Sequence, residues 1–150
     1  MNTSSLSRNL GCLCSLAVLF LAMPARAGDV VMVLNARNPT QELAINELKA
    51  IYLGQTSFWH GVVPMKVFTR PAKSAATTSF LEEQLQISVQ KLERTWTAKQ
   101  LAGQGIAPTE LAEASEVVAG VAANPGAIGF LTAEEAWGLE PNGVKYVQLD

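Results

Sequence analysis

The sequence predicts an α/β domain with a central sheet covered by helices on both faces. Residues 30–34 (VVMVL) form an unbroken apolar run, which is typical of a strand buried on both faces of a sheet. Further short strand-like runs alternate along the chain with segments whose apolar residues recur at helical spacing, and this alternation favours a layered architecture. No internal repeat, low-complexity tract or linker divides the chain, so we expect one domain.

The first half of the domain follows this alternation. A turn-rich loop over residues 35–40 follows the first strand. A helix comes next, and Gly54 lies where a C-cap would end it. Residues 62–69 return to strand character, with Pro64 near the start, where no ladder donor is needed. The residues at helical spacing in this helix are Ala44, Leu48, Ile51 and Tyr52.

The second half continues in the same way. Residues 70–80 lead from the strand into a helix, and a further helix is expected to stop at Gly103. The apolar residues that indicate these two helices are Phe80, Leu81 and Leu85, then Val89, Leu92 and Trp96. The remaining expected elements are a loop over 103–108, a helix over 111–123 ended by Asn124-Pro125-Gly126, a buried strand over 127–131, a helical turn over 134–137 and a strand over 144–149.

The first 27 residues have the pattern of a secretory signal peptide. Arg8 supplies a positive region, residues 10–23 are apolar, and residues 25–27 (ARA) form a small-x-small cleavage site. The apolar run is too short for a comfortable membrane span, and no later stretch approaches the ~20 residues required. We expect cleavage after Ala27, a periplasmic or secreted protein, and a mature domain over residues 28–150.

Both cysteines lie inside this predicted leader. A lipoprotein anchor on Cys12 or Cys14 is the competing interpretation, but Asn9 stands where lipoprotein signals carry an aliphatic residue. The mature chain therefore has no cysteine, which excludes disulfides, a thiol nucleophile and a thiolate metal site.

Charge and composition restrict the class of function further. Without Arg8 and Arg26, 9 Lys and Arg stand against 13 Asp and Glu, a formal net charge of −4 that argues against a nucleic-acid partner. His60, the one histidine, has no neighbouring metal-ligand or catalytic partner in the sequence. No acid/base pair stands out, so we expect no enzyme activity, metal or cofactor. We interpret these glutamates as solvated faces: Glu110, Glu113, Glu116, Glu134, Glu135 and Glu140.

The segment at residues 70–80 (RPAKSAATTSF) is the best candidate for a binding site. A helix start presents free backbone N–H groups to an anion, and Arg70 can clamp an oxyanion with two hydrogen bonds. The candidate ligand contacts are Arg70, Ser74 and Thr77, with Asn35 from the loop after the first strand. The alternatives are structural: Ser74 as an N-cap, Asn35 in an Asx-turn and Arg70 in an ion pair.

Three segments, in order and at matching spacing, resemble phosphate ABC transporter substrate-binding proteins. Residues 47–59 (ELKAIYLGQTSFW) resemble that family's EL-x-x-IFLGK-x-x-x-W stretch, and residues 124–130 (NPGAIGF) its PGAIGY segment. Residues 70–80 lie where the family has an Arg-x-x-Gly-Ser-Gly-Thr phosphate loop. The resemblance implies a single lobe of a type II periplasmic-binding-protein-like fold, with a mixed sheet flanked by helices.

The phosphate loop departs from the family pattern, and the departure leaves two hypotheses. Arg70 and Ser74 match, but Lys73 and Ala75 replace the two glycines and Ala76 replaces the threonine. The first hypothesis is a periplasmic solute-binding module for phosphate or a related oxyanion, with a link to ABC-type uptake. Because one lobe offers half a cleft, it would need a second copy or a partner lobe. The alternative is a non-transport accessory or interaction domain that retains the fold and has lost the ligand site.

Overall fold

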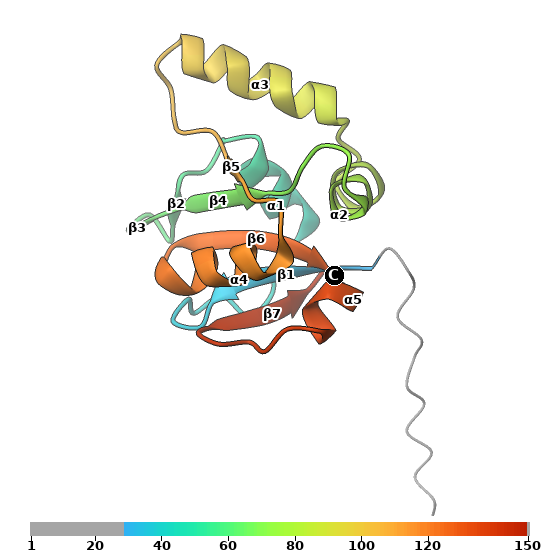
Figure 1. Ribbon diagram of the computed structural model, residues 1–150. Coiled ribbons are helices and arrows are strands. Elements are labelled where there is room, and N and C mark those ends of the chain that lie inside the picture. Colours follow the sequence, from blue (N-terminus) through green and yellow to red (C-terminus); the bar gives the residue numbers. More distant parts are fainter. Residues whose placement is uncertain (1–28, 150) are drawn as a thin grey trace, which may run out of the picture.

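The computed structural model describes residues 29–149, so the predicted leader lies outside the described residues. Helices and strands alternate along the chain (Figure 1). In chain order the elements are β1 (Val30–Asn35), α1 (Ile45–Tyr52), β2 (Phe58–Trp59), β3 (Val63–Pro64), β4 (Lys66–Thr69), α2 (Ala75–Thr77), the π-helix η1 (Thr78–Gln84), α3 (Val89–Leu101), β5 (Thr109–Glu110), α4 (Ala114–Ala123), β6 (Ala127–Thr132), α5 (Ala133–Trp137) and β7 (Val144–Gln148).

A five-stranded mixed sheet organises the domain, with the strand order β5-β4-β6-β1-β7. β4 runs parallel to β5 and β6, whereas β1 runs antiparallel to both of its neighbours, β6 and β7. The arrows of β4, β6 and β7 therefore point one way and β1 points the other, and α2 and α5 lie at the arrowhead end (Figure 1). The predicted α/β class, a mixed sheet flanked by helices, is confirmed.

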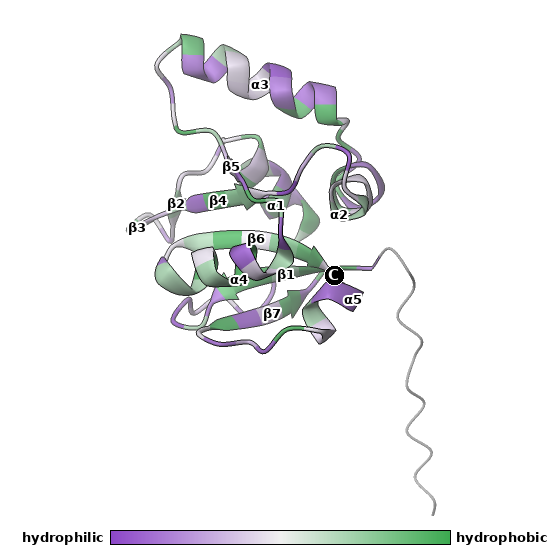
Figure 2. Ribbon diagram, in the orientation of Figure 1, coloured by the Kyte–Doolittle hydropathy of each residue, from purple (hydrophilic) through white to green (hydrophobic). Residues whose placement is uncertain are grey.

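β1 lies between two apolar layers. All six of its residues are buried, as expected for a strand covered on both faces. Because successive side chains point to opposite faces, Met32 and Leu34 pack with α1, η1 and α3, whereas Val31 and Val33 pack with α4 and α5. The strands of the sheet are predominantly hydrophobic, whereas the surface helix α3 mixes both kinds of residue (Figure 2).

Three aromatic rings form the centre of one layer. The rings of Phe80 and Phe130 stack with centroids 4.3 Å apart, and Tyr52 meets Phe80 edge-on at 4.8 Å. The Tyr52 hydroxyl donates to the carbonyl of Phe68 at 3.1 Å. Burial raises the pKa of Tyr52 far above its ordinary value, so the hydroxyl remains a donor.

Tyr52→Phe should lower the free energy of unfolding by about 1 kcal/mol, because it removes one buried hydrogen bond and leaves the ring packing in place. Urea unfolding of the variant and the wild type would measure the difference. Tyr146→Phe is a suitable control, since the Tyr146 hydroxyl is 3.4 Å from the Leu139 carbonyl and the residue is half-buried. Equal stability of Tyr52→Phe and wild type would contradict a stabilising role for this bond.

The helix after residue 74 differs from the one expected. It begins as α2 and continues as the π-helix η1, with the amide of Leu85 donating to the carbonyl of Phe80 at 2.9 Å. Phe80, Leu81 and Leu85 are fully buried, as predicted, and the five-residue spacing from Phe80 to Leu85 suits this wider turn. The apolar residues were identified correctly, whereas the helix type was not.

The strand expected over residues 62–69 divides into two. β3 pairs with β2 in a small hairpin, and β4 then joins the main sheet. The hairpin is held against the sheet because the Trp59 indole and the amide of Lys66 both donate to the Gly126 carbonyl, each at 3.0 Å. The helix expected over 111–123 begins only at Ala114, because the amide of Leu111 extends the pairing of β5 with β4 by donating to the Thr69 carbonyl.

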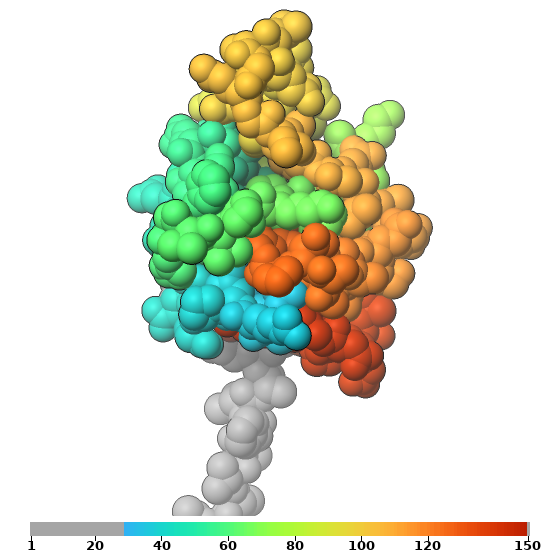
Figure 3. All heavy atoms as spheres, turned by 90° about the vertical axis from the view of Figure 1, so that its left-hand side faces the viewer, coloured from blue at the N-terminus to red at the C-terminus, as the bar shows by residue number. Residues whose placement is uncertain are grey.

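α3 packs against the rest of the domain along one side. Leu92 and Trp96 are its buried residues, and the Trp96 indole donates to the Tyr52 carbonyl at 2.7 Å. Gly103 follows its end with a positive φ of 67°, as expected for a residue that stops a helix. Residues of α3 project from one end of the molecule in Figure 3.

Candidate functional site

The carboxyl edge of the sheet brings the predicted loop beside the end of β6. β4 and β6 are parallel neighbours, so residues 70–78, after β4, lie beside the start of α5, after β6. In open α/β sheets ligands bind at this kind of edge. The structure therefore places Arg70 at the carboxyl edge of the sheet, directly after β4.

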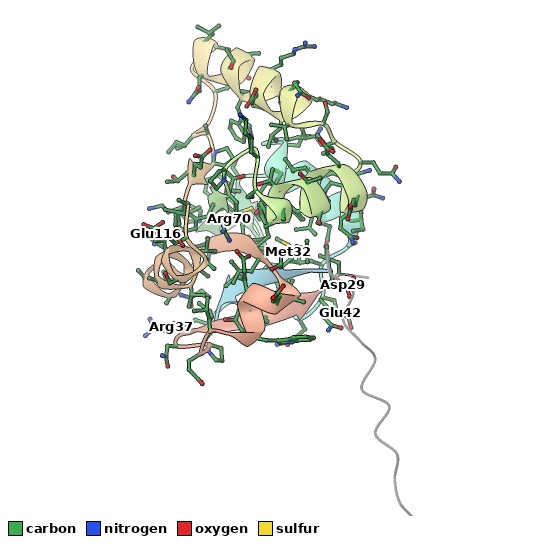
Figure 4. All side chains as sticks on the ribbon, turned by 45° about the vertical axis from the view of Figure 1, so that its right-hand side comes forward. Asp29, Met32, Arg37, Glu42, Arg70 and Glu116 are labelled. Carbon is green, nitrogen blue, oxygen red and sulfur yellow. The ribbon has the colours of Figure 1, made fainter. Side chains whose placement is uncertain are left out.

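Arg70 is almost fully buried, with 7% of its surface exposed. Its Nη1 donates to Oε2 of Glu135 at 3.1 Å, and its Nη2 donates to Oε1 of Glu135 at 3.0 Å. Nη2 also donates to the Ala112 carbonyl at 3.0 Å. The Nε of Arg70 is buried and has no hydrogen-bond partner among residues 29–149. Figure 4 shows the side chain of Arg70 inside the fold. Of the alternatives for Arg70, the ion pair is the one present in this structure.

Ser74 and Thr77 lie close to Arg70 and bond to each other. The Ser74 Oγ accepts from the amide of Thr77 at 3.1 Å, so Ser74 is an N-cap, as one interpretation predicted. It also donates to the Thr77 hydroxyl at 2.9 Å. Thr77 Oγ1 donates to the Pro71 carbonyl at 2.9 Å, with the Arg70 carbonyl at 3.2 Å. The segment from Arg70 to Thr77, a loop that leads into α2, is thereby closed on itself by the hydroxyls of Ser74 and Thr77.

Asn35 does not join these three residues. It ends β1, and because β1 is antiparallel to β6, it lies level with the start of β6, near Ala127. Arg70 lies level with the other end of β6, about 13 Å further along the strand direction at ~3.3 Å per residue. The Asn35 amide donates to the carbonyls of Val121 and Ala122 at 2.9 and 3.0 Å, and its Oδ1 accepts from the amide of Arg37. We correct the expectation of a common site: Asn35 has the alternative Asx-turn role.

Glu135 is the residue of this edge that the sequence does not reveal: the expected solvated glutamate is the ion-pair partner of Arg70. It lies in the first turn of α5 and closes a capping box with Thr132: its Oε2 accepts from the Thr132 amide at 3.0 Å. In the sequence, the Thr-x-x-Glu pattern at residues 132–135, directly after a strand, is the signal that could have identified Glu135 as a helix-capping residue at this edge.

The charge state of Glu135 follows from these contacts. Partial burial acts to raise its pKa, but the hydrogen bonds from Arg70 and Thr132 and the charge of Arg70 outweigh that effect. The pKa of Glu135 is therefore below its ordinary value, and the carboxylate is ionised at neutral pH. About a third of its side chain remains exposed, at 31%.

The stabilisation from this ion pair should depend on pH. Because the folded-state pKa is lowered, the contribution is fully present above the ordinary value of 4.5 and is lost as the pH falls through the folded-state value. Urea unfolding of wild type and Glu135→Gln at several pH values would show it. We expect wild type to have the higher free energy of unfolding at pH 7, and the difference from Glu135→Gln to shrink as the pH falls below 4.5. An advantage that stays constant down to about pH 2 would contradict this assignment.

The part of the chain that the structure describes, residues 29–149, contains no group of three side chains that could hold a metal ion. None of its helices has the length and apolar character of a membrane span.

A groove lies apart from the edge that carries Arg70. The groove has a volume of about 580 Å³ and lies between α1 and the β2–β3 hairpin, near the start of β4, with His60, Trp59 and Glu47 among its lining residues. It includes no residue of the 70–78 loop.

The family follows from the sequence of residues 19–146, which matches the family described as a PBP superfamily domain. The chain belongs to that family. No curated protein matches this PBP superfamily domain. The family match and similar solved structures confirm the predicted fold. They also confirm the resemblance to phosphate ABC transporter substrate-binding proteins.

Several solved structures are similar to this PBP superfamily domain. An ABC-type phosphate transport receptor from Vibrio cholerae has 23% identity and a TM-score of 0.60, covering 81% of this chain and 46% of that chain. PstS from Borrelia burgdorferi has 13% identity and a TM-score of 0.63, covering 81% and 47%. A Clostridium perfringens protein with bound phosphate, assigned to the phosphate ABC transporter substrate-binding proteins, has 17% identity and a TM-score of 0.62, covering 81% and 45%. This PBP superfamily domain thus spans less than half the length of these proteins.

Proposed function

We propose that this domain is a periplasmic solute-binding module that recognises phosphate or a related small oxyanion at the carboxyl edge of its sheet. The observation that carries the proposal is Arg70: a buried guanidinium at the edge where α/β sheets bind ligands, next to a Ser-capped helix start. The phosphate-related solved structures with the same fold support this choice of ligand class.

The contacts would come from Arg70, Ser74 and Thr77. Arg70 would supply the positive charge and paired N–H donors that match an oxyanion, and the two hydroxyls would supply further donors. Ser74 and Thr77 bond to each other and to nearby carbonyls, so contact with a ligand would exchange only hydrogen bonds within this segment. Recognition would be by charge and hydrogen bonds, with no reaction on the ligand.

A single lobe covers one side of a ligand, whereas most ligand sites bury the large majority of the ligand surface. We infer that a second copy or a partner lobe would complete the cleft, and that coupling to an ABC transporter would follow from that assembly. A periplasmic location fits a secretory leader over residues 1–27 with cleavage after Ala27.

Titration calorimetry of the domain with phosphate, sulfate and other small oxyanions would test this function. We expect saturable heat with phosphate and a preference over at least one of the other anions. A folded protein that gives no heat with any of them at millimolar concentration would reject the proposal and favour the accessory-domain alternative.

A further inference from the structure

The Arg70–Glu135 pair has a consequence for ligand binding, and it rests on the proposed function. We propose that Glu135 is an internal competitor of the ligand: its carboxylate occupies the Arg70 nitrogens that a bound oxyanion requires, and the oxyanion must displace it. The affinity of the site is then set by a residue outside the 70–78 loop.

The hydrogen-bond geometry of Arg70 carries this inference. A guanidinium presents two forks of paired N–H groups to an oxyanion: an end-on fork formed by Nη1 and Nη2, and a side-on fork formed by Nε and Nη2. Glu135 holds the end-on fork, with contacts of 3.1 and 3.0 Å. The Ala112 carbonyl accepts from Nη2 at 3.0 Å and takes half of the side-on fork. Neither fork is open to a ligand that binds with two oxygens.

The surroundings of the pair make an exchange feasible. A buried guanidinium without a counter-ion is unfavourable, so the carboxylate stabilises Arg70 while no ligand is bound. An oxyanion on the same fork would replace that charge and keep Arg70 compensated. Glu135 is the exposed partner, at 31% against 7% for Arg70, so its carboxylate can be hydrated when it leaves. It also keeps a local partner, because it accepts from the amide of Thr132.

The Nε of Arg70 gives a second, independent observation. It is buried and has no partner among the described residues while Glu135 holds the end-on fork. A buried donor without a partner is unfavourable, so the pair with Glu135 leaves the hydrogen-bonding capacity of this guanidinium incompletely satisfied.

Glu135→Gln tests the inference by calorimetry with phosphate. Glutamine keeps the size of the side chain and an oxygen for the Thr132 amide, but it removes the competing charge. We expect the affinity for phosphate to rise roughly tenfold or more, the change expected when one charge-assisted hydrogen bond no longer has to be broken. Glu134→Gln is the matched control: Glu134 is exposed in the same turn of α5, and the substitution changes the net charge equally. Its affinity should equal that of wild type.

A measurement on the wild type covers the case in which Glu135→Gln is too unstable to titrate. The carboxyl ¹³C resonance of Glu135 should shift as phosphate binds, because the carboxylate exchanges Arg70 for water. Phosphate binding to the wild type without that shift would overturn the inference, as would equal affinities of Glu135→Gln and wild type. In both cases the proposed function would stand. If folded wild type, Glu135→Gln and Glu134→Gln all fail to bind phosphate, sulfate and the other small oxyanions, both proposals are rejected.

Discussion

Arg70→Ala should reduce phosphate binding at least about 100-fold, because it removes the positive charge and the paired donors of the proposed site. The domain should remain folded. The Glu135 carboxylate loses its partner, but 31% of its side chain is exposed and it retains the Thr132 amide. Titration calorimetry would measure the affinity, and circular dichroism would verify the fold.

Arg37→Ala is the matched control for this prediction. Arg37 is an exposed arginine just after Asn35, and Figure 4 shows it well away from Arg70. The substitution removes the same charge from the protein, so a general electrostatic effect would weaken binding in both variants. Unchanged affinity in Arg70→Ala would remove Arg70 from the site. Equal losses in both variants would indicate nonspecific attraction.

Gly126→Ala should lower the free energy of unfolding by about 3 kcal/mol, the upper part of the usual range for overpacking. A Cβ at residue 126 would lie 2.0 Å from the carbonyl oxygen of Pro64, which is backbone and cannot rotate away. The β2–β3 hairpin would have to move. The hydrogen bonds that the Gly126 carbonyl accepts from Trp59 of the hairpin and from Lys66 at the start of β4 would then weaken or break.

Gly138→Ala provides the control for this effect. Gly138 ends α5 with an ordinary φ of −80°, and a Cβ there would meet no atom closer than 3.6 Å. We expect its stability to be equal to that of wild type or slightly higher. Urea unfolding of both variants would make the comparison. A Gly126→Ala protein as stable as Gly138→Ala would contradict the close packing of the hairpin.

Periodicity and turn chemistry were sufficient to predict most of the fold. The run at residues 30–34 identified β1 as a strand covered on both faces, and Gly54 and Gly103 marked helix ends where φ is indeed positive. Neither the antiparallel direction of β1 nor the π-helix could be predicted, since both depend on contacts between distant segments. Because β1 runs antiparallel to β6, Asn35 lies at the opposite edge of the sheet from Arg70.

The candidate site was predictable only in part for the same reason. The loop that carries Arg70, Ser74 and Thr77 is continuous in sequence, so its residues could be identified together. Glu135 lies 65 positions beyond Arg70, and only the parallel pairing of β4 with β6 brings the two side chains together. A capping-box interpretation of residues 132–135 would place Glu135 in the first turn of its helix, but it would not identify the cation that Glu135 contacts.

An NMR titration of the ¹⁵N-labelled domain with phosphate is the most direct test of an oxyanion site at residues 70–78. We predict saturable shifts of the Arg70 Nε–H and of the backbone amides of residues 74–78, all described by one dissociation constant. Shifts confined to another region, such as the groove beside His60 and Glu47, with the Arg70 resonance unchanged, would contradict the proposed site.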